Sequence, residues 1–275
     1  MRTVKNLVIS ASSLLVLACI LVNCSKDIVI MPEAVNSGEM NLKSGSLVAT
    51  ATSPFNLWGY TWNIKSASGM GPGNNTWNPG NVSVDAEGIH LQIKFNSGTG
   101  KWECAEVWTS ETLGFGTYEW VVKGQVDQYN EDVVLGLFNY LPTTIQGAKK
   151  TAEIDIEFSR WGNTAETRMG GYTVWPNKTN LKQSTFPFTM LATTTAPITT
   201  THRFTWRSNG VYFQSFDASG KEFASATFAP SKPTQYIPQV AEPVHINLWV
   251  FEGGIKMTDH FKTYEVLITN FKKIP

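Results

Sequence analysis

Three carboxylates alternate with apolar residues in the run Glu153-Ile-Asp-Ile-Glu-Phe158. Successive side chains of a β-strand point to opposite faces, so Glu153, Asp155 and Glu157 would share one face of a strand. Neighbouring carboxylates repel one another, and folding gains nothing from this unless a ligand, a cation or shared protons relieve it. The spacing therefore favours a functional strand, with a solvated strand face or a cation site as the alternatives.

Two acids on one strand could perform retaining glycoside hydrolysis, which needs a nucleophile and an acid/base about 5–5.5 Å apart. The α-carbons of Glu153 and Glu157 would lie roughly 13 Å apart at ~3.3 Å per residue, so the long side chains must lean together on a twisted sheet. The shorter Asp155 would couple to a neighbour and help to keep the acid protonated. The three residues thus have the types and the order that this chemistry requires.

Aromatic residues follow the acidic run closely, at Trp161, Tyr172 and Trp175. Aromatic faces stack on the apolar faces of sugar rings, and the chain is rich in them, with 10 Trp, 8 Tyr and 15 Phe. Most of these side chains are expected in the core. The three beside the acids are expected to contact a sugar.

The segment from Glu153 to Phe158 resembles the signature of glycoside hydrolase family 16, in the uninterrupted form of the lichenases and xyloglucan-active members. Other segments are similar to successive strands of that family, in the same order. They are residues 102–108, 114–123, 134–140, 202–213, 245–249 and 264–271. The resemblance covers roughly residues 55–275.

The resemblance implies a role for each acid. Glu153 would be the nucleophile, Asp155 an electrostatic helper and Glu157 the general acid/base. Glu106 falls where the family often has a substrate-contacting Glu, and Trp108 stands where relatives close to the lichenases carry Arg. Together with these two, the residues expected to bind substrate are Tyr140, Trp161, Tyr172, Trp175 and Trp249.

Short β-rich runs bounded by Gly, Asn, Pro and Ser recur along the chain, and no long helical period follows the leader. The strongest predicted strands are 82–93, 118–126, 133–140, 152–158, 203–206 and 244–250. We expect an all-β fold, a two-sheet antiparallel β-sandwich of the jelly-roll, concanavalin A-like type. Residues 51–275 would form it as one catalytic domain.

The N-terminus has the pattern of a secretory signal peptide, with Arg2 and Lys5 before an apolar run at 7–22. The segment around Cys24 resembles a bacterial lipoprotein processing site, with Cys19 as the alternative lipidated residue. The sequence predicts a signal peptide at 1–23 and a lipidated cysteine with a flexible linker at 24–50. An uncleaved single-span anchor is the other interpretation. The expected location is the bacterial cell envelope, lipid-anchored at the outer membrane or facing the cell surface.

Charge and composition limit the classes of partner that the protein could bind. Lys plus Arg number 22 and Asp plus Glu number 22, which gives no basic surface for nucleic acid. We expect a polysaccharide substrate, a membrane contact through the lipid anchor, and a monomer. Cys104 is alone in the mature domain and is expected to be structural.

No cofactor or metal motif is present. The four histidines have no ligand-type partner at metal spacing, and the cofactor prediction is none, with a structural calcium ion left open by the resemblance. His245 is of interest because its strand resembles one near the cleft of the family.

The sequence therefore predicts a retaining, endo-acting glycoside hydrolase that cleaves internal β-linkages of a polysaccharide, most simply a β-glucan. A transglycosylase of the same family is the close alternative, since only the acceptor of the intermediate differs. A non-catalytic carbohydrate-binding surface lipoprotein and an adhesive lipoprotein with a cation site are the alternatives from other classes.

Overall fold

The computed structural model describes residues 49–141, 153–177, 180–193 and 195–275, and all of these belong to one compact unit. The predicted signal peptide and lipidation site lie outside the described residues, as does the predicted linker up to residue 48. Residues 49 and 50 form strand β1 (Ala49–Thr50). None of the described helices is long and apolar enough to span a bilayer.

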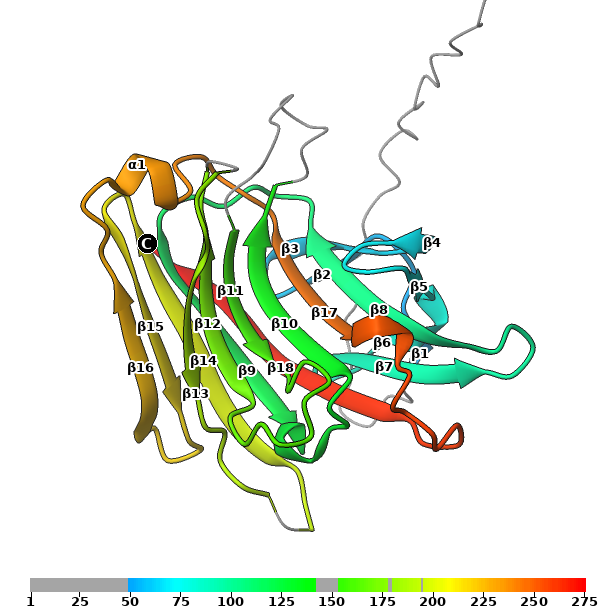
Figure 1. The fold of residues 1–275 in the computed structure, drawn as a ribbon. Coiled ribbons are helices and arrows are strands. Elements are labelled where there is room, and N and C mark those ends of the chain that lie inside the picture. Colours follow the sequence, from blue (N-terminus) through cyan, green and yellow to red (C-terminus); the bar gives the residue numbers. More distant parts are fainter. Residues whose placement is uncertain (1–48, 142–152, 178–179, 194) are drawn as a thin grey trace, which may run out of the picture. The chain divides into compact units, whose positions relative to one another are not determined.

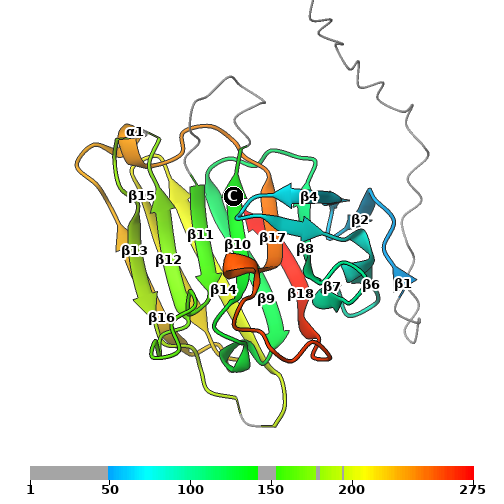
Figure 2. The same cartoon turned by 45° about the vertical axis from the view of Figure 1, so that its right-hand side comes forward.

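One sheet, here called the cleft sheet, has the strand order β2-β3-β8-β17-β10-β11-β12-β13 and is antiparallel throughout. Figures 1 and 2 show β17, β10 and β11 side by side in this layer. Its strands are β2 (Phe55–Leu57), β3 (Tyr60–Ile64), β8 (Lys101–Thr109), β10 (Val133–Tyr140), β11 (Glu153–Phe158), β12 (Gly170–Trp175), β13 (Ser184–Phe188) and β17 (Val244–Val250).

A second sheet, the outer sheet, has the order β1-β6-β7-β18-β9-β14-β15-β16, also antiparallel. Its further strands are β6 (Val82–Val84), β7 (Ile89–Asn96), β9 (Gly116–Gly124), β14 (Ile198–Arg207), β15 (Gly210–Phe216), β16 (Glu222–Phe228) and β18 (Tyr264–Ile274). The end of β7 pairs with the start of β8 and so joins the two sheets. Strands β9, β14 and β18 lie behind the cleft sheet in Figure 2.

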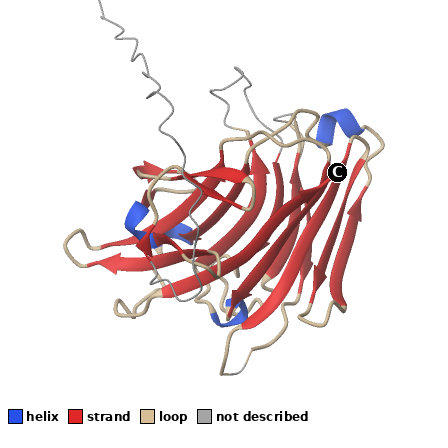
Figure 3. Cartoon of the chain, turned by 180° about the vertical axis from the view of Figure 1, so that it is seen from behind, coloured by secondary structure: helices blue, strands red, loops and turns tan. Residues whose placement is uncertain are grey.

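Short elements complete the described chain, and the view from behind in Figure 3 shows strands with a few helical turns between them. A hairpin of β4 (Ala67–Met70) and β5 (Asn75–Trp77) meets β8, with β5 and β8 parallel. The helical turns are α1 (Pro233–Tyr236) and the 3-10 helices η1 (Pro79–Asn81), η2 (Val126–Gln128) and η3 (Phe251–Gly253).

The core between the sheets is strongly aromatic. Its largest fully buried side chains are Trp62, Trp77, Trp120, Trp206, Tyr118, Tyr172, Phe158, Phe204, Phe213 and Phe271. The strand β14 alternates buried and partly exposed residues, as a strand with one covered face should. By contrast, β10 and β17 are buried along nearly their whole length. Both faces of these two strands are therefore covered, one by the core and the other by residues of a cleft.

The predicted all-β, two-sheet antiparallel sandwich is confirmed. Strands 133–140 and 244–250 have the predicted bounds, and 203–206 lies within β14. The single strand predicted at 82–93 is wrong, because β6 and β7 form a hairpin there. The turn between them contains Gly88 at φ +144°, where a Cβ atom would lie 2.0 Å from the Ile268 carbonyl oxygen, so no other residue fits.

Candidate active site

A cleft of about 730 Å³ lies on the face of the cleft sheet that points away from the core. It crosses five adjacent strands, from β8 through β17, β10 and β11 to β12. Nine of the predicted site residues line it, namely Glu106, Trp108, Tyr140, Glu153, Asp155, Glu157, Trp161, Trp175 and Trp249. Residues from distant parts of the sequence thus share one surface.

The three acids lie on β11, in the middle of this cleft. The strand pairs with β10 and β12 in an unbroken register, and Ile154, Ile156 and Phe158 point into the core with no exposed surface. The alternation of the sequence is therefore the alternation of the strand. It places Glu153, Asp155 and Glu157 in the cleft.

Asp155 is the most deeply buried of the three acids, with 2% of its surface exposed. Its Oδ2 accepts a hydrogen bond of 2.8 Å from the indole Nε1 of Trp175. Burial, the charges of Glu153 and Glu157 and a side-chain hydrogen bond with Glu153 raise the pKa of Asp155 well above its usual range, against the opposing effect of Trp175. Asp155 therefore holds a proton more readily than an exposed aspartate and can share it with a neighbour.

Glu157 is protonated at neutral pH. Burial first, and then the negative charge of Glu153, raise the pKa of Glu157 to about 8. The same charge raises the pKa of Asp155 and of the buried Glu242. The charge of Glu153 thus raises the pKa of all three neighbouring acids, and Glu157 holds a proton that it can give away.

Two glycines flank Glu157 on the neighbouring strands. Gly136 of β10 and Gly171 of β12 lie directly opposite it in the sheet. A Cβ atom on Gly136 would lie 2.5 Å from Oδ1 of Asn247, so a side chain is excluded there. No side chain therefore rises from the sheet on either side of Glu157. Glycine at such strand positions is typical of a place that another molecule approaches closely.

A second polar cluster lies two and three strands from the acids. Glu106 on β8 is 4% exposed, and its carboxylate contacts Nδ1 of His245 at 3.0 Å and Nζ of Lys65 at 2.7 Å. Burial by itself raises the pKa of Glu106, but the hydrogen bond and charge of His245 and the charge of Lys65 outweigh it and hold that pKa low. Glu106 is therefore ionised and fully occupied by protein partners.

The aromatic residues divide between cleft and core. Trp161 is 44% exposed, has φ of 52° and packs edge-on against Trp249 at 6.0 Å and Phe251 at 5.7 Å. A positive φ at a bulky residue is uncommon and occurs where surrounding contacts impose it, often in ligand sites. These residues give the cleft an apolar wall beyond Glu157.

Tyr172 does not lie in the cleft, and its expected position is corrected. It pairs with the core residue Ile156, is buried, and its hydroxyl lies 2.6 Å from the hydroxyl of Ser215. Trp175 is three residues away and so faces the other side of β12. Thr173 lies opposite Asp155 and is therefore on the cleft side of β12, where Tyr172 was expected.

Several cleft residues were not identified from the sequence. The structure adds Lys65, Phe138, Asn247 and the segment 70–72 to the lining. Cys104 is buried, its Sγ lies 3.5 Å from Oδ1 of Asn75, and burial raises the pKa of its thiol to about 12, which agrees with a structural role. Among the described residues, no group of three or more His, Cys, Asp or Glu is placed to hold a metal ion.

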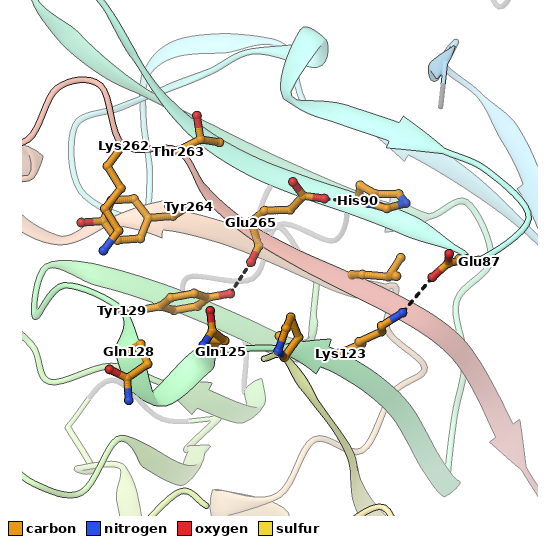
Figure 4. Close-up of a pocket in the computed structure, with 13 residues that line it drawn as sticks. Glu87, His90, Lys123, Gln125, Gln128, Tyr129, Lys262, Thr263, Tyr264 and Glu265 are labelled. Atoms are coloured by element: carbon orange, nitrogen blue, oxygen red, sulfur yellow. Dashed lines mark hydrogen bonds and ion pairs between the residues drawn. The ribbon is translucent and has the colours of Figure 1, made fainter. Parts of the chain in front are cut away.

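Another cavity, of about 470 Å³, lies on the outer sheet (Figure 4). Four of its charged or ionisable side chains are paired: Lys123 with Glu87 at 3.0 Å, and His90 with Glu265 at 2.8 Å. The Tyr129 hydroxyl donates to the Glu265 carbonyl at 2.7 Å. These contacts link neighbouring strands and account for the polar lining.

Together the fold and the site define an all-β sandwich with an acidic cleft across one sheet. No protein-family model matches the chain, and no curated protein matches it. Solved structures do match. A β-glucanase from Bacillus licheniformis superposes with a TM-score of 0.57 at 21% identity, over 78% of this chain and 92% of that one.

Two further structures widen this comparison. A glycoside hydrolase family 16 protein for mixed-linkage glucan from Bacteroides ovatus, in complex with a G4G4G3G product, has a TM-score of 0.58 at 14% identity, over 78% and 94% of the two chains. An immunostimulatory antigen of Mycobacterium tuberculosis, described as a pseudo β-1,3-glucanase, has a TM-score of 0.56 at 17% identity, over 77% and 89%. This chain has the fold of the β-glucanases.

Proposed function

We propose that this protein is a retaining glycoside hydrolase that cleaves internal linkages of a neutral β-glucan. The observation that carries the proposal is the acid strand in the cleft, on which Glu153, Asp155 and Glu157 share one face and burial and the charge of Glu153 raise the pKa of Glu157 to about 8. A retaining enzyme needs a protonated acid beside a charged carboxylate before its first step.

In the first step, a carboxylate oxygen of Glu153 attacks the anomeric carbon of the sugar. The bond from that carbon to the glycosidic oxygen breaks, and Glu157 gives its proton to the departing oxygen. In the second step, Glu157 takes a proton from water, and the oxygen of that water displaces Glu153. Asp155, held by Trp175, adjusts the charge on Glu153 as the covalent bond forms and breaks.

Cleft length and charge support the substrate class. Five strands at ~4.8 Å spacing give a cleft of about 19 Å between the outer strand axes, which has room for several sugars and suits attack within a chain. Of the described residues that line it, Lys65 carries the one permanent positive charge, and Glu106 neutralises it. The described lining therefore offers no net positive charge to a sulfated or uronic acid polymer, which favours a neutral glycan.

The test is reducing-end release by the purified domain on mixed-linkage β-glucan, β-1,3-glucan, xyloglucan and agarose, with Glu153→Gln and Glu157→Gln as matched variants. We expect release from at least one neutral glucan and its loss in both variants. Retention is read by NMR from the anomeric configuration of the first product. An inverted product would refute the proposed mechanism.

The second candidate is a carbohydrate-binding protein without turnover. The observation that favours it is the shared fold of the mycobacterial protein that is described as a pseudo β-1,3-glucanase. Glucan binding with no release of reducing ends or of transglycosylation products would select this candidate. Oligosaccharides longer than the substrate would instead select a transglycosylase.

We further propose that the N-terminus carries a lipid on Cys24. The support is the sequence alone, namely the basic start, the apolar run and the polar change after this cysteine. Mass spectrometry of the mature N-terminus in wild type and in Cys19→Ser and Cys24→Ser variants tests it. Loss of the acyl mass only in Cys19→Ser would move the site to that residue.

A further inference from the structure

The cleft contains a buried imidazole, that of His245, which has no role in the two steps of the proposed reaction. His245 lies on β17, is 5% exposed and lines the cleft. Its Nδ1 is 3.0 Å from Oε1 of Glu106, and its Nε2 is buried without a hydrogen-bond partner. Buried polar atoms are seldom left unpaired, so each such atom in a cleft marks a place where a ligand group fits.

Glu106 decides which nitrogen of the ring carries the proton. An ionised carboxylate only accepts hydrogen bonds, so Nδ1 donates to it. The other oxygen of Glu106 accepts from Lys65 at 2.7 Å, and Lys65 also donates to the Gly71 carbonyl oxygen at 2.8 Å. With Nδ1 bound to Glu106, Nε2 is left for a ligand in the cleft, where it is suited to a hydroxyl group, which can both donate and accept.

Aromatic neighbours fix the ring plane of His245. It stacks on Phe138 with centroids 5.0 Å apart and planes at 24°. On its other flank Trp108 lies nearly parallel, with centroids 6.3 Å apart and planes at 16°, and Tyr140 meets it edge-on at 5.9 Å. The imidazole is therefore held before any ligand arrives, which lowers the entropic cost of binding.

The sheet register places this ring on a line with the acids. Trp108, His245, Phe138 and Asp155 lie directly opposite one another on four successive strands. At ~4.8 Å per strand, His245 is about 10 Å and Trp108 about 14 Å from the acid strand. A glycan that crosses the strands would bring a sugar other than the reacting one to His245.

We propose that His245, oriented by Glu106, binds a hydroxyl group of a neutral sugar in a subsite away from the cleaved bond, and that Trp108 stacks on the sugar beyond it. This inference rests on the proposed function. Glu106 is a positioning residue here, because its two oxygens are held by His245 and Lys65. The family resemblance implies a direct sugar contact for Glu106. In this proposal His245 makes that contact instead.

The test compares chain lengths. The His245→Phe variant keeps the stacking on Phe138 but loses both ring nitrogens, and His245→Gln restores an amide that can accept. Wild type and both variants are assayed on a ladder of oligosaccharides from the cleaved glucan. His90→Gln, on the outer sheet, is the control for replacing a histidine.

For His245→Phe we expect kcat/KM on the longest oligosaccharides to fall about tenfold relative to the shortest one that is cleaved, mainly through KM. His245→Gln should recover part of this loss, and Glu106→Gln should shift the same ratio in the same direction. His90→Gln should leave the ratio unchanged. An equal loss of kcat/KM at every chain length, or no loss, would overturn the proposal. A residue with only a structural role would lower kcat/KM equally for short and long oligosaccharides.

Binding separates this inference from the proposed function. If wild type releases no reducing ends, a ladder of mixed-linkage β-glucan oligosaccharides is titrated against wild type and His245→Gln by calorimetry. Affinity that rises with chain length in wild type and less steeply in the variant would support the subsite while the hydrolase proposal fails. Equal affinities in both proteins would overturn the subsite as well.

Discussion

The proton on Glu157 leads to the most quantitative prediction. Burial and the charge of Glu153 raise the pKa of Glu157 from 4.5 to about 8. At pH 7 about nine-tenths of the molecules then hold the proton, against about 0.3% for an unshifted carboxyl, a ratio of about 300. We therefore expect kcat/KM on the cleaved glucan to fall tenfold per pH unit above about pH 8.

The causes of this shift can be separated by a variant. Glu153→Gln removes the nearby charge and leaves the burial, which is the larger cause. The pKa of Glu157 should fall in this variant but stay above 4.5. Because the variant is expected to be inactive, the carboxyl carbon of Glu157 is followed by 13C NMR, with Glu153→Gln/Glu157→Gln to assign the signal.

A control and a refuting result follow from the same reasoning. Glu265→Gln, on the outer sheet, should leave the titration of Glu157 in place. A wild-type titration near 4.5 would refute the assignment of Glu157 as the acid. An unchanged titration in Glu153→Gln would refute the electrostatic coupling of the two residues.

Three further predictions concern buried and paired groups. Burial and then the charge of Glu153 raise the pKa of Glu242 to about 9, so the folded state holds more protons than the unfolded state between pH 4.5 and 9. Through Glu242 alone, stability to urea should fall by up to about 1.4 kcal/mol per pH unit in that range, and Glu242→Gln should reduce the measured slope by that contribution. Trp175→Phe removes the hydrogen bond to Asp155 and should lower kcat about tenfold with little change in KM; an unchanged kcat would contradict the role of this bond. The bond to Glu265 is the largest cause that raises the pKa of His90, so its stabilisation is present below pH 6.5 and lost as pH rises through the folded pKa. Since the Glu265 side chain is 43% exposed, His90→Gln should cost under about 1 kcal/mol at pH 6 and less at pH 9, which urea melts at both pH values would measure.

Local periodicity made the acid strand readable from the sequence. The alternation from Glu153 to Phe158 specifies two faces without reference to any other strand, and β11 has those faces. The same rule shows why the placement of Tyr172 failed. Residues 172 and 175 are separated by an odd number, so both cannot face the cleft on one strand. This parity is present in the sequence, and on a strand it decides the facing of a residue whatever its distance along the chain from the acids.

The other residues of the cleft could not be predicted from local periodicity. Lys65, Phe138 and His245 come from three strands or strand ends far apart in the sequence, and only the register of the folded sheet brings them together. Register depends on pairing between distant segments, which a local pattern does not encode. A family resemblance pointed to Glu106 and to the strand of His245, but not to the contacts of Glu106 with His245 and Lys65, which change its expected role.

The glycines beside Glu157 have a consequence for the fate of its proton. Gly136 and Gly171 leave no side chain on either side of this acid in its row of the sheet. A polar neighbour there would offer the proton a second destination and would compete with the glycosidic oxygen for it. With that route missing along the row, a glycan that covers the acid places its glycosidic oxygen where the proton can leave.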